Sequence, residues 1–196
     1  MLWAAMHVYD ALIQRRTVHA YDPREVPADV LERALEAARW APNHKLTNPW
    51  RFYLMGEKTK AQVAEVAADL AGATARQSGA DEERVAMVSD VGRQKILTSP
   101  VLIAVSSRRV PDDAFRERED YAATACAIQN IQLSLWADGV GAKWSTGAVT
   151  RDARVYPIVG ADPESEELVG FVKAGYPAKV PQVRRKALED VVIRLG

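Results

Sequence analysis

Hydrophobic residues in the first forty positions recur every three to four residues, which is the spacing of an amphipathic helix. The pattern predicts a short helix from Val8 to Arg15. A second helix runs from Pro27, which suits a first helical turn, to about Trp40, and Pro42 ends it. Charged residues occupy the opposite face of the second helix. Both helices therefore carry an apolar face that needs a partner.

Two later runs have the character of β-strands. Residues 51–55 form a short strand that Gly56 ends. Residues 101–106 are nearly all apolar, which predicts a central strand buried on both faces. Residues 72–95 are alanine-rich and polar, and we expect helical pieces around a loop at Ser78–Gly79 that cover the molecule.

The longest helix is predicted over residues 120–138. It is apolar nearly all round, so we expect it to be buried in the core or against a second subunit. Strands follow at residues 142–144 and 168–174, and residues 176–196 look like an extended arm. Consecutive strands near the end argue against a regular βαβ alternation, so the predicted fold class is α+β.

Length and charge narrow the choice of function. The 196 residues are enough for one domain with a sizeable core, which we place at residues 1–196. The formal net charge of zero gives no support for a nucleic-acid partner. No apolar run approaches the roughly 20 residues that span a bilayer, and residues 1–10 do not resemble a signal peptide. We therefore expect no membrane partner and a cytoplasmic location.

Several common catalytic centres find no support. The three histidines lack the spacing of metal ligands, so no metal site is predicted. There is no P-loop, no GxGxxG and no GxSxG motif. The one cysteine, Cys126, lies within the long helix among alanines, and we expect it to be buried and inert.

Polar residues gather in four short segments at the ends of predicted elements, where loops carry function. Together these segments offer cations, amide donors and an aromatic plane, the mixture that an anionic, planar ligand needs. The segments are residues 15–19, 43–48, 144–147 and 184–186.

Each segment also has a simpler explanation. Arg15 and Arg16 could be charges that complement a helix C-terminus. His44 could be a turn residue, and Trp144 could anchor the core. Composition and spacing alone therefore reach only a possible phosphate-bearing cofactor.

These segments resemble the motifs of the FMN-dependent NAD(P)H nitroreductase family. Residues 15–22, RRTVHAYD, are similar to R-R-S-x-R-x-(F/Y). Residues 37–52 contain A-P-N-H-K and N-P-W-R-F, similar to one bacterial branch with A-P-(D/N)-H-K. Residues 139–148, GVGAKWSTGA, resemble G-x-G-x-x-W-x-(S/T)-G-A, and residues 169–177 resemble V-G-F-x-x-x-G-x-P. The match covers nearly the whole chain in order.

The resemblance implies a role for the two cationic ends of the chain. Arg15, Thr17 and His19, in one motif with Arg16, would meet the flavin phosphate, the ribityl chain or the pyrimidine end. Arg185 matches a tail arginine that pairs with the phosphate, and two arginines on one phosphate give charge-assisted bonds. His19 stands where arginine or lysine is common, which weakens the local positive charge.

The resemblance also assigns the middle segments. His44 and Leu46 fall in a loop that would reach the flavin from the partner subunit, although many members have an asparagine where Leu46 stands. Trp144, Ser145 and Thr146 match the segment that runs beside the isoalloxazine ring. A protein tunes a flavin in this way, while the cofactor carries the chemistry, so we predict no catalytic residue.

The implied fold is an α+β nitroreductase-like sandwich, with a central, mainly antiparallel sheet flanked by helices. The implied assembly is a homodimer with an exchanged C-terminal arm, residues 176–196. The implied reaction is ping-pong: FMN takes electrons from NADH or NADPH and passes them to a nitroaromatic, a quinone or a similar flat acceptor.

Two alternatives stay open. The same fold could serve a flavin-dependent dehydrogenase, a dehalogenase or a flavin-consuming enzyme, which would add a substrate lid; residues 72–95 are the candidate. A non-catalytic flavin carrier is the other alternative, and His19 and Leu46 favour it.

Overall fold

A four-stranded antiparallel sheet forms the centre of the protein. The computed structural model describes residues 6–195. The strands are β1 (Trp50–Leu54), β2 (Val101–Arg108), β3 (Gly141–Ser145) and β4 (Glu166–Gly175), in the order β1-β2-β4-β3. All three pairings are antiparallel. The predicted α+β class with a mainly antiparallel sheet is confirmed, and each strand lies close to its predicted position.

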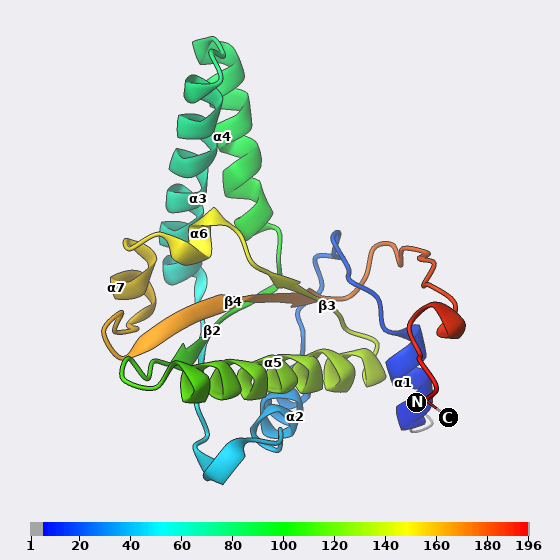
Figure 1. Cartoon of the computed structure of the whole chain (residues 1–196). Coiled ribbons are helices and arrows are strands. Elements are labelled where there is room, and N and C mark those ends of the chain that lie inside the picture. The colour runs from blue at the N-terminus through cyan, green and yellow to red at the C-terminus, as the bar shows by residue number, and fades with distance from the viewer. Residues whose placement is uncertain (1–5, 196) are drawn as a thin grey trace.

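Helices cover both faces of this sheet (Figure 1). Helices α2 (Ala28–Arg39) and α5 (Ala114–Ala137) pack on one face. Helix α3 (Glu57–Gln77) and the short helix α7 (Val155–Val159) pack on the other. The remaining helical elements are α1 (Val8–Gln14), α4 (Glu82–Leu97), α6 (Ala148–Arg151) and two 3-10 turns, η1 (His44–Leu46) and η2 (Leu188–Asp190).

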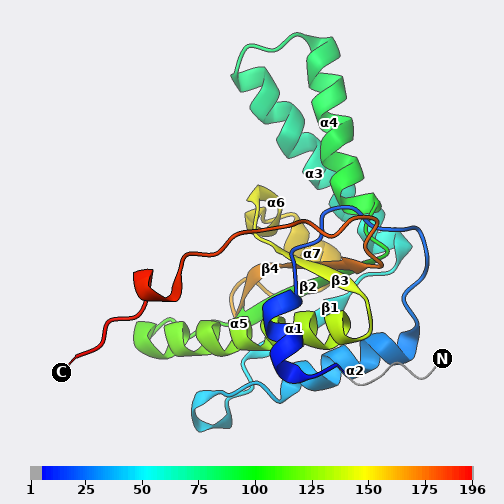
Figure 2. The same ribbon diagram turned by 90° about the vertical axis from the view of Figure 1, so that its right-hand side faces the viewer.

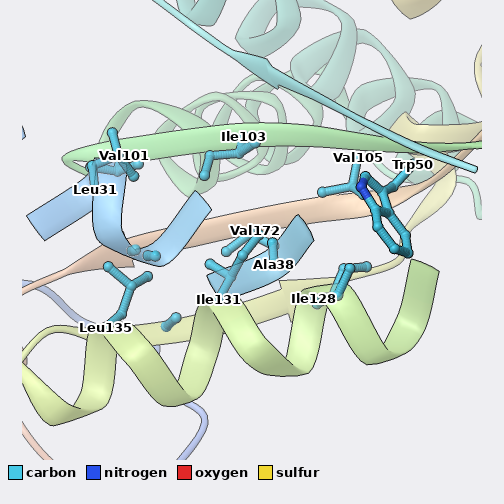
Figure 3. Close-up of a cluster of buried hydrophobic side chains, with 14 of the residues drawn as sticks. Leu31, Ala38, Trp50, Val101, Ile103, Val105, Ile128, Ile131, Leu135 and Val172 are labelled. Atoms are coloured by element: carbon cyan, nitrogen blue, oxygen red, sulfur yellow. The ribbon is translucent and has the colours of Figure 1, made fainter. Parts of the chain in front are cut away.

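Strand β2 explains why there are two hydrophobic cores. Its side chains alternate between the faces of the sheet, as in any strand. Val101, Ile103 and Val105 point toward α2 and α5, where they meet side chains such as Ile131 of α5 (Figure 3). Leu102 and Ala104 lie in the second core, beneath α3 and α7. The prediction that this strand is buried on both faces is therefore confirmed.

Helices α3 and α4 form an antiparallel hairpin that projects from the body of the protein in both views (Figures 1 and 2). The turn lies at Ser78–Gly79, and the side chain of Asp81 caps α4 by accepting a 2.8 Å hydrogen bond from the Arg84 amide. Helical pieces around this loop were predicted. The expectation that they cover the molecule is wrong for most of the hairpin. Its two helices pack mainly against each other, and their outer parts project away from the sheet.

Helix α5 differs from its prediction in two ways. It begins at Ala114, earlier than expected, because the Asp113 side chain accepts a 2.9 Å hydrogen bond from the Arg116 amide and caps it. The first half of its face away from the sheet is exposed, and Phe115 is 74% exposed there. The expectation that Cys126 is buried is wrong, because this residue lies on that outer face.

Helix α1 and the chain after β4 lie on the same side of the protein (Figures 1 and 2). The Ala178 amide donates to the Ala20 carbonyl, and the chain then runs past the end of α5 (Figure 2). Both segments expose hydrophobic side chains, among them Tyr9, Leu12 and Ile13 of α1 and Leu188, Val191 and Ile193 of the arm. Within residues 6–195, no helix combines the length and apolar character needed to cross a bilayer.

Helices α3 and α4 pack closely at Gly92, and this packing predicts the effect of a substitution there. A Cβ at Gly92 would lie 2.7 Å from the Ala67 carbonyl oxygen, so Gly92→Ala should lower the free energy of unfolding by about 1–3 kcal/mol. Gly72→Ala is the matched control, because it meets mainly the Ser89 hydroxyl, which can rotate away. The control should be neutral or stabilising by up to about 1 kcal/mol, the usual gain within a helix. Denaturant titration would measure both, and equal effects would contradict the predicted packing.

Candidate functional site

The segment after α1 is held against the edge of the sheet. The Val18 amide donates a 3.2 Å hydrogen bond to the Ala142 carbonyl of β3, and Thr17 forms a parallel bridge with Ala142. Further along, the Asp22 amide donates to the Tyr176 carbonyl at 2.8 Å. These bonds place residues 15–19 beside β3, although they are far from it in the sequence.

Among residues 6–195, three arginines lie near one another at the end of α1 without an acidic partner. Arg15 donates a 3.3 Å hydrogen bond to Oε1 of Gln132 on α5, but its buried Nε has no partner among residues 6–195. Desolvation and the nearby charges of Arg185 and Arg16 lower the pKa of Arg15. In the described chain, no carboxylate forms an ion pair with any of the three. The described residues therefore gather positive charge here without a carboxylate to balance it.

Arg16 also has the simpler role considered from the sequence. Its guanidinium donates to the carbonyls of Ile13 and Arg15, at 2.7 and 3.0 Å, where α1 ends. Such bonds satisfy carbonyls that a helix C-terminus leaves free. A role for Arg16 in flavin binding stays a prediction.

A cleft of about 460 Å³ opens beside this segment, between α4 and strands β3 and β4. His19 and Ser145, two of the predicted site residues, line it. Three lysines that sequence reasoning missed also line it: Lys95, Lys143 and Lys173. Lys143 and Lys173 interrupt the predicted apolar strands. A lysine within such a strand was the available signal that one face of the strand lines a polar site.

Lys173 is the most buried of these lysines, at 8% exposure. Its ammonium donates to the Lys95 carbonyl at the end of α4. Burial, followed by the charges of Lys143 and Lys95, lowers the pKa of Lys173 to about 8. The cleft is therefore positively charged on several sides.

Trp144 faces away from the cleft. Its indole Nε1 donates a 3.2 Å hydrogen bond to the Val169 carbonyl, and its ring packs on the core beneath α2 and α5. A Cβ at Gly170 would collide with this ring, and the φ of +154° at Gly170 also favours glycine. Trp144 thus anchors β3 while Ser145 faces the cleft and Thr146 is exposed.

His44 and Leu46 lie in a strained loop apart from the other predicted residues. Lys45, Leu46 and Asn48 all have positive φ, between 45° and 54°, which is uncommon for residues other than glycine. Thr47 donates a 2.7 Å hydrogen bond to the buried Asp120 and holds the loop in place. His44 Nδ1 lies 3.3 Å from Glu119 Oε1, and Leu46 is 79% exposed.

Neither His44 nor Leu46 lines the cleft within one chain. The single chain places residues 15–19 beside residues 142–145 and Arg185 near Arg15, and it leaves residues 44–46 exposed. Strain of this kind gathers at functional sites.

Comparison with known proteins agrees with this architecture. The model of the Nitroreductase family matches residues 12–176. YfhC of Bacillus subtilis (strain 168), provisionally named an NAD(P)H nitroreductase, is 32% identical over 181 residues, which cover 90% of this chain and 88% of that protein.

Two solved structures are similar over almost the whole chain. A nitroreductase-like family protein from Bacillus cereus is 28% identical, with a TM-score of 0.80 and full coverage of both chains. A nitroreductase from Bacteroides fragilis NCTC 9343, solved with bound FMN, is 25% identical, with a TM-score of 0.70, and covers 97% of this chain and 99% of its own. The family match spans the sheet, both helical layers and the cationic segment after α1, and the chain therefore belongs to the nitroreductase family.

Proposed function

We propose that the protein is an FMN-dependent oxidoreductase that passes electrons from NAD(P)H to nitroaromatics, quinones or similar flat electrophiles. The observation that carries the proposal is the buried Nε of Arg15, which lies within a group of three arginines and has no partner among the described residues. Membership in the nitroreductase family supports it.

The arginine group fits a phosphate. Like charges brought together in a partly buried place destabilise a protein unless an anion joins them. A phosphate dianion would accept charge-assisted hydrogen bonds from Arg15 and from Arg185 of the arm. Thr17, exposed on the same extended segment, offers a hydroxyl to the neighbouring ribityl chain.

The cleft fits the ring system. His19, Ser145 and Thr146 would lie along the isoalloxazine, with Trp144 keeping β3 rigid from behind. Bound FMN would supply the chemistry, accepting electrons from NAD(P)H and donating them to the acceptor in ping-pong order. The residues of the chain bind and orient the cofactor, and we assign none of them as a catalytic acid or base.

We infer that the working form is a homodimer. Helix α1, the outer face of α5 and the arm all expose hydrophobic side chains, and contiguous exposed patches of this kind are typical of interaction sites. In a two-fold dimer, the arm (residues 176–196) would exchange between subunits, and the loop with His44 and Leu46 would reach the flavin of the other subunit.

One observation favours the alternative of a more specialised flavin enzyme. The inner end of α4 lines the cleft through Val91, Gln94 and Lys95, so the projecting α3–α4 hairpin stands where a substrate lid would be. A dehalogenase, a dehydrogenase or a flavin-consuming enzyme would use such a lid to select one substrate.

The colour of the purified protein is the first test of this function. We expect a yellow preparation, or uptake of added FMN, and bleaching of the flavin absorbance when NADH or NADPH is added without oxygen. Bleaching that nitroaromatics or quinones do not reverse would favour the specialised enzyme. Colour without bleaching would favour a flavin carrier, and failure to take up FMN would exclude all three.

Replacing Arg15 should affect FMN binding and protein stability in different ways. Arg15→Gln should weaken FMN binding about 10- to 100-fold, because a hydrogen bond to a charged group contributes about 1.5–3 kcal/mol. The same change should leave the flavin-free protein at least as stable, since it relieves repulsion from Arg16 and Arg185. Flavin fluorescence and thermal unfolding would measure the two effects. Arg84→Gln, on the hairpin, is the control, and a loss of stability without weaker binding would count against the assignment.

Charges placed on the exposed apolar faces should dissociate the dimer. Leu12→Asp on α1 and Ile193→Asp on the arm should each raise the dimer dissociation constant at least about 10-fold, because each hydrophobic side chain buried contributes about 1.5–3 kcal/mol. Met87→Asp, on the similarly exposed surface of α4, should have no effect. Sedimentation velocity would measure the assembly, and dimers that survive both substitutions would contradict the proposed interface.

A further inference from the structure

Lys143 occupies an unusual position in the cationic cleft. Its Nζ lies 3.4 Å from Nδ1 of His19, across the gap between β3 and the segment after α1. The β3–β4 register places Lys143 directly opposite Lys173. Like charges that face each other across strands are destabilising, so this pairing needs a compensating partner.

The walls of the cleft do not supply that partner. Among residues 6–195, Asp90 is the one acidic residue that lines it, and its carboxylate already accepts a 3.2 Å hydrogen bond from Arg93. Lys173 directs its ammonium to the Lys95 carbonyl. Within residues 6–195, no carboxylate forms an ion pair with Lys143. The cleft therefore presents a positive charge to whatever it binds.

The direction of the extended segment indicates which part of a flavin would meet this charge. Arg15 and His19 are four residues apart, which corresponds to about 13 Å of extended chain. If the phosphate lies at Arg15, the far end of the ring system lies toward His19 and Lys143. Ser145 lines the same cleft two positions after Lys143, so the ring would run along this face of β3.

We propose that Lys143, with His19 beside it, supplies the positive charge that faces the pyrimidine end of FMN and raises the reduction potential of the bound flavin. This inference rests on the proposed function. Two-electron reduction leaves negative charge on the pyrimidine ring, and a fixed cation nearby favours the reduced form. Lys143 on β3 would therefore adjust the reduction potential of bound FMN, together with His19.

The test is the midpoint potential of bound FMN in the full-length protein, measured by equilibration with a reference dye. Lys143→Gln should reduce the preference for reduced over oxidised FMN about tenfold, which lowers the potential by about 30 mV. Lys143→Arg keeps the charge and should retain the wild-type potential. Lys58→Gln removes an exposed charge at the start of α3, outside the cleft, and should also leave it unchanged.

Each other outcome contradicts the proposal. An unchanged potential in Lys143→Gln would overturn it, and so would an equal fall in Lys143→Arg, which would indicate a packing effect. A changed KM for NADPH with an unchanged potential would place the charge at the nicotinamide cofactor instead. If the wild-type protein binds FMN and is bleached by NAD(P)H while Lys143→Gln has no effect, only this inference fails. If the wild type takes up no flavin, the proposed function fails with it.

Discussion

Within residues 6–195, Arg15, Arg16 and Arg185 lie near one another without a negative partner, and the position that we propose for the cofactor follows from this charge. A folded chain normally pairs or solvates its charges, yet the buried Nε of Arg15 has no partner in the part of the chain that the structure describes. Other contacts hold the two segments that carry these charges. Arg15 is held on α5 through Gln132, and the chain after β4 is fixed by the bond from Ala178 to Ala20 before it reaches Arg185.

Strand β3 connects this charge group to the cleft. It is an edge strand of the sheet, and the segment after α1 covers part of its free edge through the bond from Val18 to Ala142. Its alternation turns Trp144 into the core and Lys143 and Ser145 toward the cleft. The close contact of Trp144 with Gly170 of β4 fixes this alternation, so packing on one face of the sheet sets the position of the polar groups on the other.

Much of this fold could be predicted from periodicity alone. The apolar run of β2, the helical spacing of α2 and the long apolar helix α5 are each strong local signals. The short helices α6 and α7 were missed because four or five residues carry too little periodicity. The exposure of Cys126 was missed because a helix that is apolar all round does not reveal which face meets the sheet.

The candidate site was only partly predictable, because some of its residues are brought together by the tertiary structure alone. Family motifs indicated residues 15–19 and 144–146, because these segments keep a recognisable order of residue types. Lys143 and Lys173 carry no motif, and only the β3–β4 register brings them opposite each other. His44 and Leu46 do not line the cleft within one chain. The role that we propose for their loop belongs to a dimer, which no local pattern specifies.

If the arginine group binds the phosphate of a flavin, as we propose, the protein must distinguish FMN from riboflavin, because the two ligands differ only in that phosphate. Titration calorimetry on the flavin-free protein should give an affinity for FMN at least about 100-fold higher than for riboflavin, since two charged hydrogen bonds of about 1.5–3 kcal/mol each are lost. Equal affinities for the two ligands would contradict the account.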